Sequence, residues 1–228
     1  MIITIDGQIA TGKSTVAKKL AHDIGYIYFD TGATYRCMTH AVLKKKVNID
    51  NPAELAQFLK DFTFNIKIKH GDRFYFVDGE DVTLVIRGEA VTHEVSKVSS
   101  LKAVRENLVA LQREWAVGVN AVFEGRDMGT VVFPQADVKV FLTGRPEVRA
   151  QRRLDELKAK FPEENKNLSL EKATEEINRR DTLDTTREIS PLLQAQGAFV
   201  VDTSDLTIDE IVYKILEHRD TIKTVTAK

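Results

Sequence analysis

The chain has 228 residues, of which 43% are hydrophobic, and a formal net charge of −1. This length fits one large or two small domains, and the apolar content is sufficient for a hydrophobic core. No apolar run approaches the roughly 18 residues that a membrane-spanning helix needs, and the first residues do not resemble a targeting leader. We therefore expect neither a membrane span nor a leader.

The cysteine, histidine and arginine positions narrow the class of protein further. The single cysteine, Cys37, excludes an internal disulfide and suits a reducing compartment, so we expect a cytoplasmic protein. The five histidines lack metal-ligand spacing, and no zinc site is expected. Arginines concentrate in 145–153 and 179–187, which favours a compact anionic partner over a nucleic acid. Nothing in the sequence requires a dimer, and we expect a monomer.

The first predicted elements are a short strand over 2–5, a glycine-rich loop and a helix from Val16. The loop reads G-Q-I-A-T-G-K-S at 7–14, the pattern of a phosphate-binding loop, in which backbone N–H groups and a helix N-terminus surround a polyphosphate. The pattern assigns the lysine to the β- and γ-phosphates and the serine hydroxyl to Mg²⁺. The residues expected to bind ATP are Gly7, Gln8, Ile9, Ala10, Thr11, Gly12, Lys13, Ser14 and Thr15.

Further along the chain, strand-length apolar runs are separated mostly by segments of helical periodicity. This alternation predicts an α/β fold with a five-stranded parallel sheet and helices on both faces, and its strands lie at 2–5, 26–29, 121–123, 138–142 and 198–201. Thr207 and Glu210 form a capping-box pattern that predicts the start of the last helix. Beyond about residue 219 the chain is polar and is expected to fray, leaving 221–228 as a flexible tail.

Two segments interrupt the alternation. Apolar residues at every second position from Phe62 to Ile68, then Phe74 and Phe76, with turns at H-G-D and D-G-E-D, predict a small antiparallel meander, so we treat 62–95 as a β insertion. The polar segment 156–172 is expected to form a short, mobile helical lid. The core domain then comprises 1–61, 96–155 and 173–220.

The segment 90–116 is helical in pattern but is not expected to form one continuous helix. Ser96 and Arg105 would lie on opposite faces of such a helix, and Ser99-Ser100 offers a break and a new N-cap. We predict two helices that turn Ser96 and Arg105 toward a common pocket.

Three further motifs point to a family. Residues 30–36 read D-T-G-A-T-Y-R, residues 124–134 read E-G-R-D-M-G-T-V-V-F-P, and residues 180–192 read R-D-T-L-D-T-T-R-E-I-S-P-L. With the phosphate loop, they resemble bacterial cytidylate kinases over about 1–220, including the insertion and the lid. Gln8-Ile9 and Thr31 depart from the usual family pattern, but neither departure removes a backbone donor or a charge.

The resemblance implies transfer of the γ-phosphoryl group of ATP to CMP or dCMP, with Mg²⁺ as cofactor and no nucleic-acid or membrane partner. It assigns the monophosphate to Arg36, Arg126 and Arg187, the ribose side to Arg180 with Asp184, and the base to Ser96, Arg105 and Asp127; Thr31 completes the substrate-binding set. The catalytic set is Lys13, Arg126, Arg180, Arg187, Arg149 and Arg153. The spacing of Arg180, Asp184 and Arg187 also predicts one shared helix face.

Some roles and alternatives remain open from the sequence. Of the arginines at 149, 152 and 153, at least one is expected to have only a structural role. Glu124 is a candidate for orienting Mg²⁺ water, and Asp6 is expected to brace the phosphate loop. The alternative functions are another small-molecule kinase with a phosphate loop, such as a shikimate or gluconate kinase, or a non-catalytic nucleotide-sensing module.

Overall fold

The computed structural model describes residues 1–69 and 72–226. The chain divides into two compact units, which we describe separately. The core unit is Met1–Asp30 with Ala116–Lys228, and the inserted unit is Thr31–Trp115. The inserted unit contains the antiparallel strands of the predicted insertion 62–95, together with the helices that pack on them.

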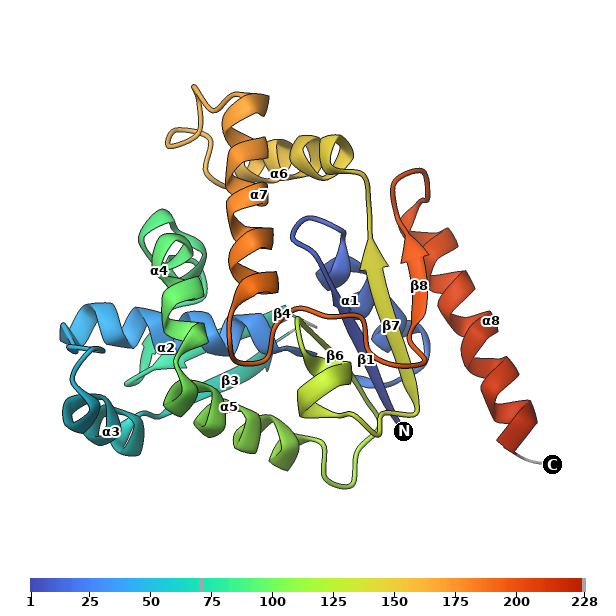
Figure 1. Cartoon of the computed structure of the whole chain (residues 1–228), viewed down its shortest axis with the longest axis horizontal. Coiled ribbons are helices and arrows are strands. Elements are labelled where there is room, and N and C mark those ends of the chain that lie inside the picture. The colour runs from blue at the N-terminus through green and yellow to red at the C-terminus, as the bar shows by residue number, and fades with distance from the viewer. Residues whose placement is uncertain (70–71, 227–228) are drawn as a thin grey trace. The chain divides into compact units, whose positions relative to one another are not determined.

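The core unit contains the predicted five-stranded parallel sheet (Figure 1). The strand order is β2-β6-β1-β7-β8, and every neighbouring pair is parallel. The strands are β1 (Ile2–Gly7), β2 (Ile27–Asp30), β6 (Ala121–Gly125), β7 (Val138–Thr143) and β8 (Phe199–Asp202). Each lies within two residues of its predicted bounds, because buried parallel strands are read from continuous apolar runs.

Among the described residues, the core unit has four α-helices. They are α1 (Lys13–Asp23), α6 (Pro146–Lys160), α7 (Leu170–Thr186) and α8 (Ile208–Thr226), with a short π-helix, η2 (Met128–Val132), after β6. Ile3 and Ile5 of β1 pack in one buried cluster with Leu20 of α1 and Ile215 of α8. The strand that leads into the phosphate loop, β1, is therefore held by packing against both of these helices.

The two helices at the predicted lid begin at residues that suit a helix start. Pro146 occupies the first turn of α6, and Ser169 caps α7 by accepting a hydrogen bond from the Lys172 N–H at 3.2 Å. Residues 161–169 connect the two helices, which pack against each other. The predicted lid, 156–172, thus comprises the end of α6, this connection and the first residues of α7.

The last helix confirms its predicted start but not its predicted end. The Glu210 carboxylate accepts from the Thr207 N–H at 2.8 Å, and the Thr207 hydroxyl accepts from the Glu210 N–H at 3.3 Å, which is the reciprocal capping box. Helix α8 continues to Thr226 instead of ending near residue 219. Residues 227 and 228 of the expected tail lie outside the described residues.

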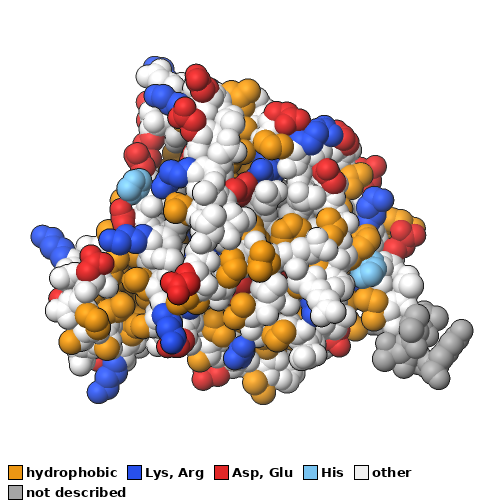
Figure 2. Space-filling view, viewed as in Figure 1, with side chains coloured by type: hydrophobic (Ala, Val, Ile, Leu, Met, Phe, Trp, Pro, Cys, Tyr) orange, Lys and Arg blue, Asp and Glu red, His pale blue; other side chains and the backbone are white. Residues whose placement is uncertain are grey.

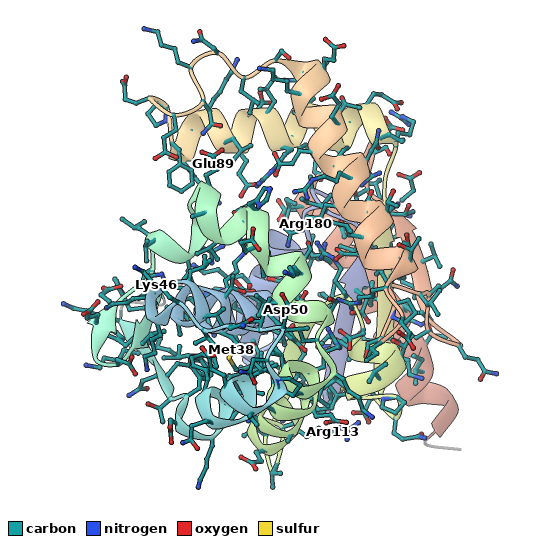
Figure 3. The ribbon with its side chains drawn as sticks, turned by 60° about the vertical axis from the view of Figure 1, so that its left-hand side comes forward. Met38, Lys46, Asp50, Glu89, Arg113 and Arg180 are labelled. Carbon is teal, nitrogen blue, oxygen red and sulfur yellow. The ribbon has the colours of Figure 1, made fainter. Side chains whose placement is uncertain are left out.

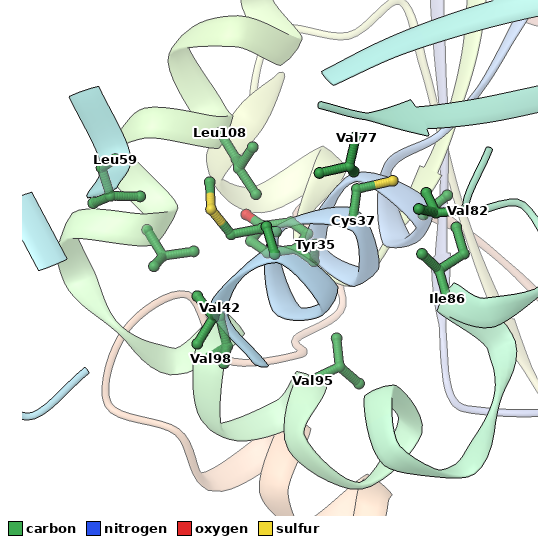
Figure 4. Close-up of a cluster of buried hydrophobic side chains, with 14 of the residues drawn as sticks. Tyr35, Cys37, Val42, Leu59, Val77, Val82, Ile86, Val95, Val98 and Leu108 are labelled. Carbon is green, nitrogen blue, oxygen red and sulfur yellow. The ribbon is translucent and has the colours of Figure 1, made fainter. Parts of the chain in front are cut away.

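The inserted unit combines helices with a three-stranded antiparallel sheet. The helices are α2 (Thr31–Lys45), α3 (Pro52–Asp61), α4 (Glu89–Ser100) and α5 (Lys102–Trp115), with a 3₁₀ turn, η1 (Val85–Arg87). The strands are β3 (Phe64–Lys69), β4 (Asp72–Val77) and β5 (Glu80–Asp81). Their core surrounds α2, where Cys37 is fully buried among side chains such as Val77, Ile86 and Leu108 (Figure 4).

The meander is confirmed, and the buried face of its second strand is the one opposite Phe74 and Phe76. Tyr75 and Val77 are buried, and they pair across β3 with Ile66 and Phe64 respectively. Phe74 and Phe76 occupy the other face, where the Lys67 ammonium lies 4.6 Å from the Phe76 ring centroid. Every residue from 74 to 77 is apolar or aromatic, so alternation alone could not fix which face is buried.

The second turn of the meander lies within the described residues. Asp78 and Gly79 connect β4 to β5 with φ values of 50° and 82°, the positive pair that a tight hairpin turn requires. The central residues of the predicted H-G-D turn, 70 and 71, lie outside the described residues.

The predicted break in the 90–116 segment is confirmed, and its position differs by one residue. Helix α4 ends at Ser100, Leu101 is extended with ψ 126°, and α5 begins at Lys102. The hydroxyls of Ser99 and Ser100 donate back into α4, to the carbonyls of Ser96 and Lys97. The expectation that a serine of this pair caps the second helix is therefore wrong, because both hydroxyls are used by the first.

Charges of both signs are interspersed over the face drawn in Figure 2. Among the described residues, no helix combines the length and apolar character that a membrane crossing demands.

Candidate functional site

The phosphate loop joins β1 to α1 through three residues with positive φ. These are Gly7 at 148°, Ala10 at 58° and Gly12 at 84°. A Cβ atom at Gly7 would lie 2.1 Å from the Leu142 carbonyl oxygen, so only glycine fits beside β7. Gly12 occupies the N-cap of α1 in the left-handed conformation, and the backbone turns there into a helix N-terminus. This is the geometry of an anion-binding loop.

Lys13 lies folded over this loop. Its ammonium donates to the Gln8 carbonyl at 2.5 Å and approaches the Thr11 hydroxyl at 3.5 Å. The side chain is buried, and burial together with the nearby Arg126 guanidinium holds the pKa of Lys13 well below its usual range. Burial and a neighbouring cation thus disfavour the charged form of Lys13, as expected where a bound phosphate would supply the opposite charge.

Carboxylates lie beside the loop at the ends of β2 and β6. Asp30 and Glu124 are register partners, and Glu124 accepts hydrogen bonds from the Tyr28 hydroxyl at 2.5 Å and from Ser14. Burial and the Asp30 carboxylate raise the pKa of Glu124. No group of three or more His, Cys, Asp or Glu side chains within the described part of the chain could hold a metal. The donor set fits Mg²⁺ that takes most of its ligands from phosphates and water, since one hydroxyl and a nearby carboxylate suffice.

Arg126, which follows β6, and Arg180 of α7 form a pair of neighbouring arginines with Asp184. The Arg126 Nε donates to Asp184 Oδ2 at 2.7 Å, and this buried pairing outweighs burial to raise the pKa of Arg126 and lower that of Asp184. Arg180 of α7 is labelled in Figure 3. Its Nε is buried without a hydrogen-bond partner among the described residues, and burial and Arg126 lower the pKa of Arg180 to about 10. Arg180 remains protonated at neutral pH, although Asp184 and Glu176 do not offset the effects of burial and of Arg126 on its pKa.

Arg187 and Asp127 form a second charged pair. Arg187 follows the last residue of α7 in an extended conformation, so the expectation that it shares a helix face with Arg180 and Asp184 is wrong. Its Nε donates to the Ser190 carbonyl at 2.6 Å, and its Nη2 lies 3.7 Å from Asp127 Oδ1. Both side chains are nearly inaccessible to solvent.

Asp6 braces a different turn from the one expected. Its carboxylate accepts the N–H groups of Met128 at 2.8 Å and Gly129 at 2.7 Å. These bonds hold the start of η2, directly after Asp127, instead of the phosphate loop. Burial raises the pKa of Asp6 to about 7.

The three arginines of α6 have different partners. Arg152 donates to the hydroxyl and the carbonyl of Thr203 at 3.0 and 2.7 Å, which is a structural role. Arg153 pairs with Glu156 and Glu176, and its buried Nε has no hydrogen-bond partner among the described residues.

Arg149 is engaged differently from both. Its Nε donates to the Gly144 carbonyl at 2.9 Å, and its Nη1 donates to the Ile9 carbonyl at 3.2 Å and to Asp181 Oδ2 at 2.6 Å. Sequence reasoning did not identify Asp181, although it directly follows Arg180 in the third family motif.

The inserted unit holds the other expected substrate residues. Arg36 donates to the Ile86 carbonyl at 3.0 Å and the Thr92 hydroxyl at 2.9 Å. Arg105 donates to the Ser99 carbonyl at 3.0 Å, with its guanidinium 5.2 Å from the Tyr35 ring centroid.

Thr31 and Ser96 are the other two expected substrate residues in this unit. Thr31 begins α2 and is buried, whereas Ser96 is half-buried on α4. The common pocket of Ser96 and Arg105 stays a prediction.

Comparison with known proteins places this arrangement in a family. The model of the cytidylate kinase family matches residues 3–221. A cytidylate kinase of Protochlamydia amoebophila is 66% identical over 224 residues, which cover 98% of each chain. A cytidylate kinase of Geobacillus kaustophilus is 46% identical over 216 residues, covering 94% of each chain.

Solved structures with low sequence identity share the fold. A shikimate kinase from Bacteroides thetaiotaomicron superposes with a TM-score of 0.51 at 14% identity, over 96% of this chain and 98% of that one. An uncharacterized protein from Eubacterium ventriosum gives a TM-score of 0.54 at 12% identity, over 97% of this chain and 98% of that one. At these identities the likeness concerns the fold alone.

Proposed function

The chain belongs to the cytidylate kinase family, and on that premise we propose that it transfers the γ-phosphoryl group of ATP to CMP or dCMP. The products are ADP and CDP or dCDP. The observation that carries this proposal in the structure is Arg180, whose Nε is buried without a hydrogen-bond partner among the described residues and whose pKa is lowered beside the Arg126–Asp184 pair. A partly buried cation with an unpartnered donor fits a phosphorylated substrate.

The reaction needs electrostatic help more than proton transfer. The attacking oxygen belongs to a phosphate that is already anionic near neutral pH, so no general base is required. Two polyanions must instead approach in line, and catalysis consists of positioning and of cations placed where charge spreads in the transition state.

On the donor side, we assign ATP to residues 7–15. Backbone N–H groups and the N-terminus of α1 receive the phosphates, and Lys13 exchanges its bond to the Gln8 carbonyl for the β- and γ-oxygens. Ser14 would hold Mg²⁺ directly, and Glu124 would do so through water. When bound, this ion neutralises charge on the β- and γ-phosphates.

On the acceptor side, we assign the monophosphate to Arg36, Arg126 and Arg187, and the ribose side to Arg180 and Asp184. Ser96, Arg105 and Asp127 are assigned to the cytosine ring, and Thr31 remains in the substrate-binding set. A carboxylate suits the exocyclic amine of cytosine, and a guanidinium suits its ring acceptors.

Membership of this family also suggests roles for the lid and for the insertion. We assign 156–172 to a lid that closes over the substrates and 62–95 to the acceptor-binding insertion. Arg153 is the lid arginine best suited to the transferring phosphoryl group, because its buried Nε has no hydrogen-bond partner in the described part of the chain. We further expect a monomeric cytoplasmic enzyme that needs neither nucleic acid nor a membrane.

One coupled assay of ADP release tests the proposal. The purified chain is given ATP and Mg²⁺ with CMP, dCMP, UMP, AMP or shikimate in turn. The expected result is the highest kcat/KM with CMP or dCMP. Greater turnover with shikimate or UMP would favour a different kinase, and absence of turnover with every acceptor would favour a nucleotide sensor.

A further inference from the structure

A single ion pair holds both backbone groups of Ile9 in the phosphate loop. The Ile9 N–H donates to Asp181 Oδ1 at 3.3 Å, and the Ile9 carbonyl accepts from Arg149 Nη1 at 3.2 Å. The two side chains are themselves joined, Arg149 Nη1 to Asp181 Oδ2 at 2.6 Å. Arg149 belongs to α6 and Asp181 to α7, so a side chain from each of these helices bonds to the same loop residue.

The bond to Asp181 bears directly on the loop lysine. In a trans peptide the C=O and the N–H point in opposite directions, so fixing the Ile9 N–H also fixes the Gln8 carbonyl. That carbonyl accepts from the Lys13 ammonium at 2.5 Å and from the Thr11 hydroxyl at 2.9 Å. One peptide plane therefore connects Asp181 to Lys13.

The bond to Arg149 acts on the next peptide. Holding the Ile9 carbonyl toward α6 sets the direction of the Ala10 N–H on the other side of the same plane. Ala10 has φ 58°, a left-handed conformation that a residue with a Cβ keeps only where its surroundings impose it. The ion pair supplies such a restraint immediately before Ala10.

Arg149 is poorly suited to swing onto the transferring phosphoryl group. Its guanidinium already meets Gly144, Ile9 and Asp181, and its side chain is only 3% exposed. Leaving these acceptors would deprive a half-buried carboxylate and two carbonyls of this donor.

We propose that Asp181, acting with Arg149, is a positioning residue that holds the phosphate loop in its ATP-binding conformation. The inference rests on the proposed function, because it takes ATP as the ligand of this loop. It moves Arg149 from the catalytic set to a supporting one, and it adds Asp181 of α7, which contacts the phosphate loop and Arg149.

Electrostatics and positioning make opposite predictions for Asp181→Asn. Asp181 is close enough to raise the pKa of Arg126, so its charge opposes the attraction of the site for a polyanion. Removing only that charge should tighten ATP binding slightly. If Asp181 positions the loop, the same substitution should weaken ATP binding, because the amide cannot hold Arg149 as an ion pair.

The experiment measures the dissociation constant of Mg²⁺–ATP, together with kcat and the KM values for ATP and CMP. For Asp181→Asn we expect the ATP constant and the ATP KM to rise about ten-fold, with the CMP KM within about two-fold of wild type. Asp155→Asn is the matched control, since Asp155 is an exposed carboxylate on α6 that pairs only with Gln151 in the described structure. It should leave all values unchanged.

Arg149→Lys provides a second, independent variant. Lysine keeps the charge but cannot hold three acceptors in a planar fork, so the ATP constant should again rise while the melting temperature reports folding. The double variant should be no weaker than the worse single variant, because both substitutions break one linkage. Should Asp181→Asn fail to fold, Arg149→Lys decides the question alone.

Unchanged or tighter ATP binding in the folded variants would overturn the positioning role. Equal increases in the KM values for ATP and CMP would also overturn it, as a general loss of structure. A wild-type chain that binds ATP but does not phosphorylate CMP would defeat the proposed function, while the ATP-binding comparison would still decide the role of Asp181.

Discussion

Single side chains of the core unit carry positive charge that the protein does not neutralise by itself. Burial lowers the pKa of both Lys13 and Arg180, and in each case the Arg126 guanidinium adds to the effect. Holding these cations together without their anion opposes folding, and a bound phosphate would remove that penalty. In the function proposed above, these cations would be in place before substrate arrives, which is the condition for electrostatic catalysis.

One substitution, at Asp127, can test how the enzyme would distinguish CMP from UMP. Asp127→Asn replaces an acceptor that suits the cytosine amine with a group that can also donate to the uracil carbonyl. We expect the CMP-to-UMP ratio of kcat/KM to fall about ten-fold, corresponding to roughly 1–3 kcal/mol of discrimination. The measurement is the ratio, because weaker pairing with Arg187 would affect both substrates alike.

Asp184→Asn is the control for this prediction. Asp184 is assigned to the ribose side, which CMP and UMP share, so its substitution should lower both rates and preserve their ratio. An Asp127→Asn enzyme with the wild-type ratio would remove Asp127 from base recognition.

At the scale of elements, the phosphate loop depends on how closely β1 approaches β7. Gly7 pairs with Leu142 in the sheet, and any side chain at Gly7 would overlap the Leu142 carbonyl. Strand register and loop conformation are therefore set at the same residue.

Gly7→Ala should consequently damage both properties. The overlap forces β1 and β7 apart where the loop begins, so we expect a lower melting temperature and at least an about ten-fold increase in the KM for ATP. Gly25→Ala is a matched control with φ 68° and no atom within 4 Å of the added Cβ. It should lower stability by only about 1–2 kcal/mol and leave the KM for ATP unchanged. Equal effects of the two substitutions on that KM would contradict the role of the close approach.

The sequence was sufficient for elements whose signal is local. Continuous apolar runs located all five parallel strands, and Thr207 with Glu210 located the start of α8. The buried face of β4 could not be read from the sequence, because aromatic and aliphatic residues occupy both of its faces. The position of the α4–α5 break differed because two serine hydroxyls bond backward into α4.

Roles that depend on distant partners could not be read from spacing. Arg149, Arg152 and Arg153 look alike in sequence, and only the fold shows their different acceptors. Asp181 was missed for the same reason, since its partner Ile9 lies 172 positions away along the chain. Long-range hydrogen bonds of this kind follow from the topology of the sheet and its helices.

At the scale of the whole molecule, the stability of the core unit depends on carboxylates that join remote segments. Asp6 links β1 to the start of η2, across 122 positions to Met128. It is buried, and the two N–H donors do not fully offset the loss of water, so the pKa of Asp6 rises from 3.8 to about 7. Ionised Asp6 therefore disfavours the folded state relative to its protonated form.

The sign of the resulting pH dependence follows from proton binding. Between about pH 4 and about pH 7, the folded state retains a proton on Asp6 that the unfolded state releases, so the free energy of unfolding falls as pH rises. The slope is about 1.4 kcal/mol per pH unit, and above about pH 7 it vanishes because both states are ionised.

Asp6→Asn should remove this contribution while keeping the shape of the side chain. We expect the difference in free energy of unfolding, wild type minus Asp6→Asn, to fall by roughly 2–3 kcal/mol between pH 5 and pH 8. Denaturant titrations followed by circular dichroism at pH 5, 6, 7 and 8 measure it. Asp209→Asn, which removes a carboxylate that is 82% exposed, should give a difference nearly independent of pH. Parallel curves for wild type and Asp6→Asn would mean that Asp6 is ionised in the folded protein throughout this range, its two backbone donors outweighing the loss of water.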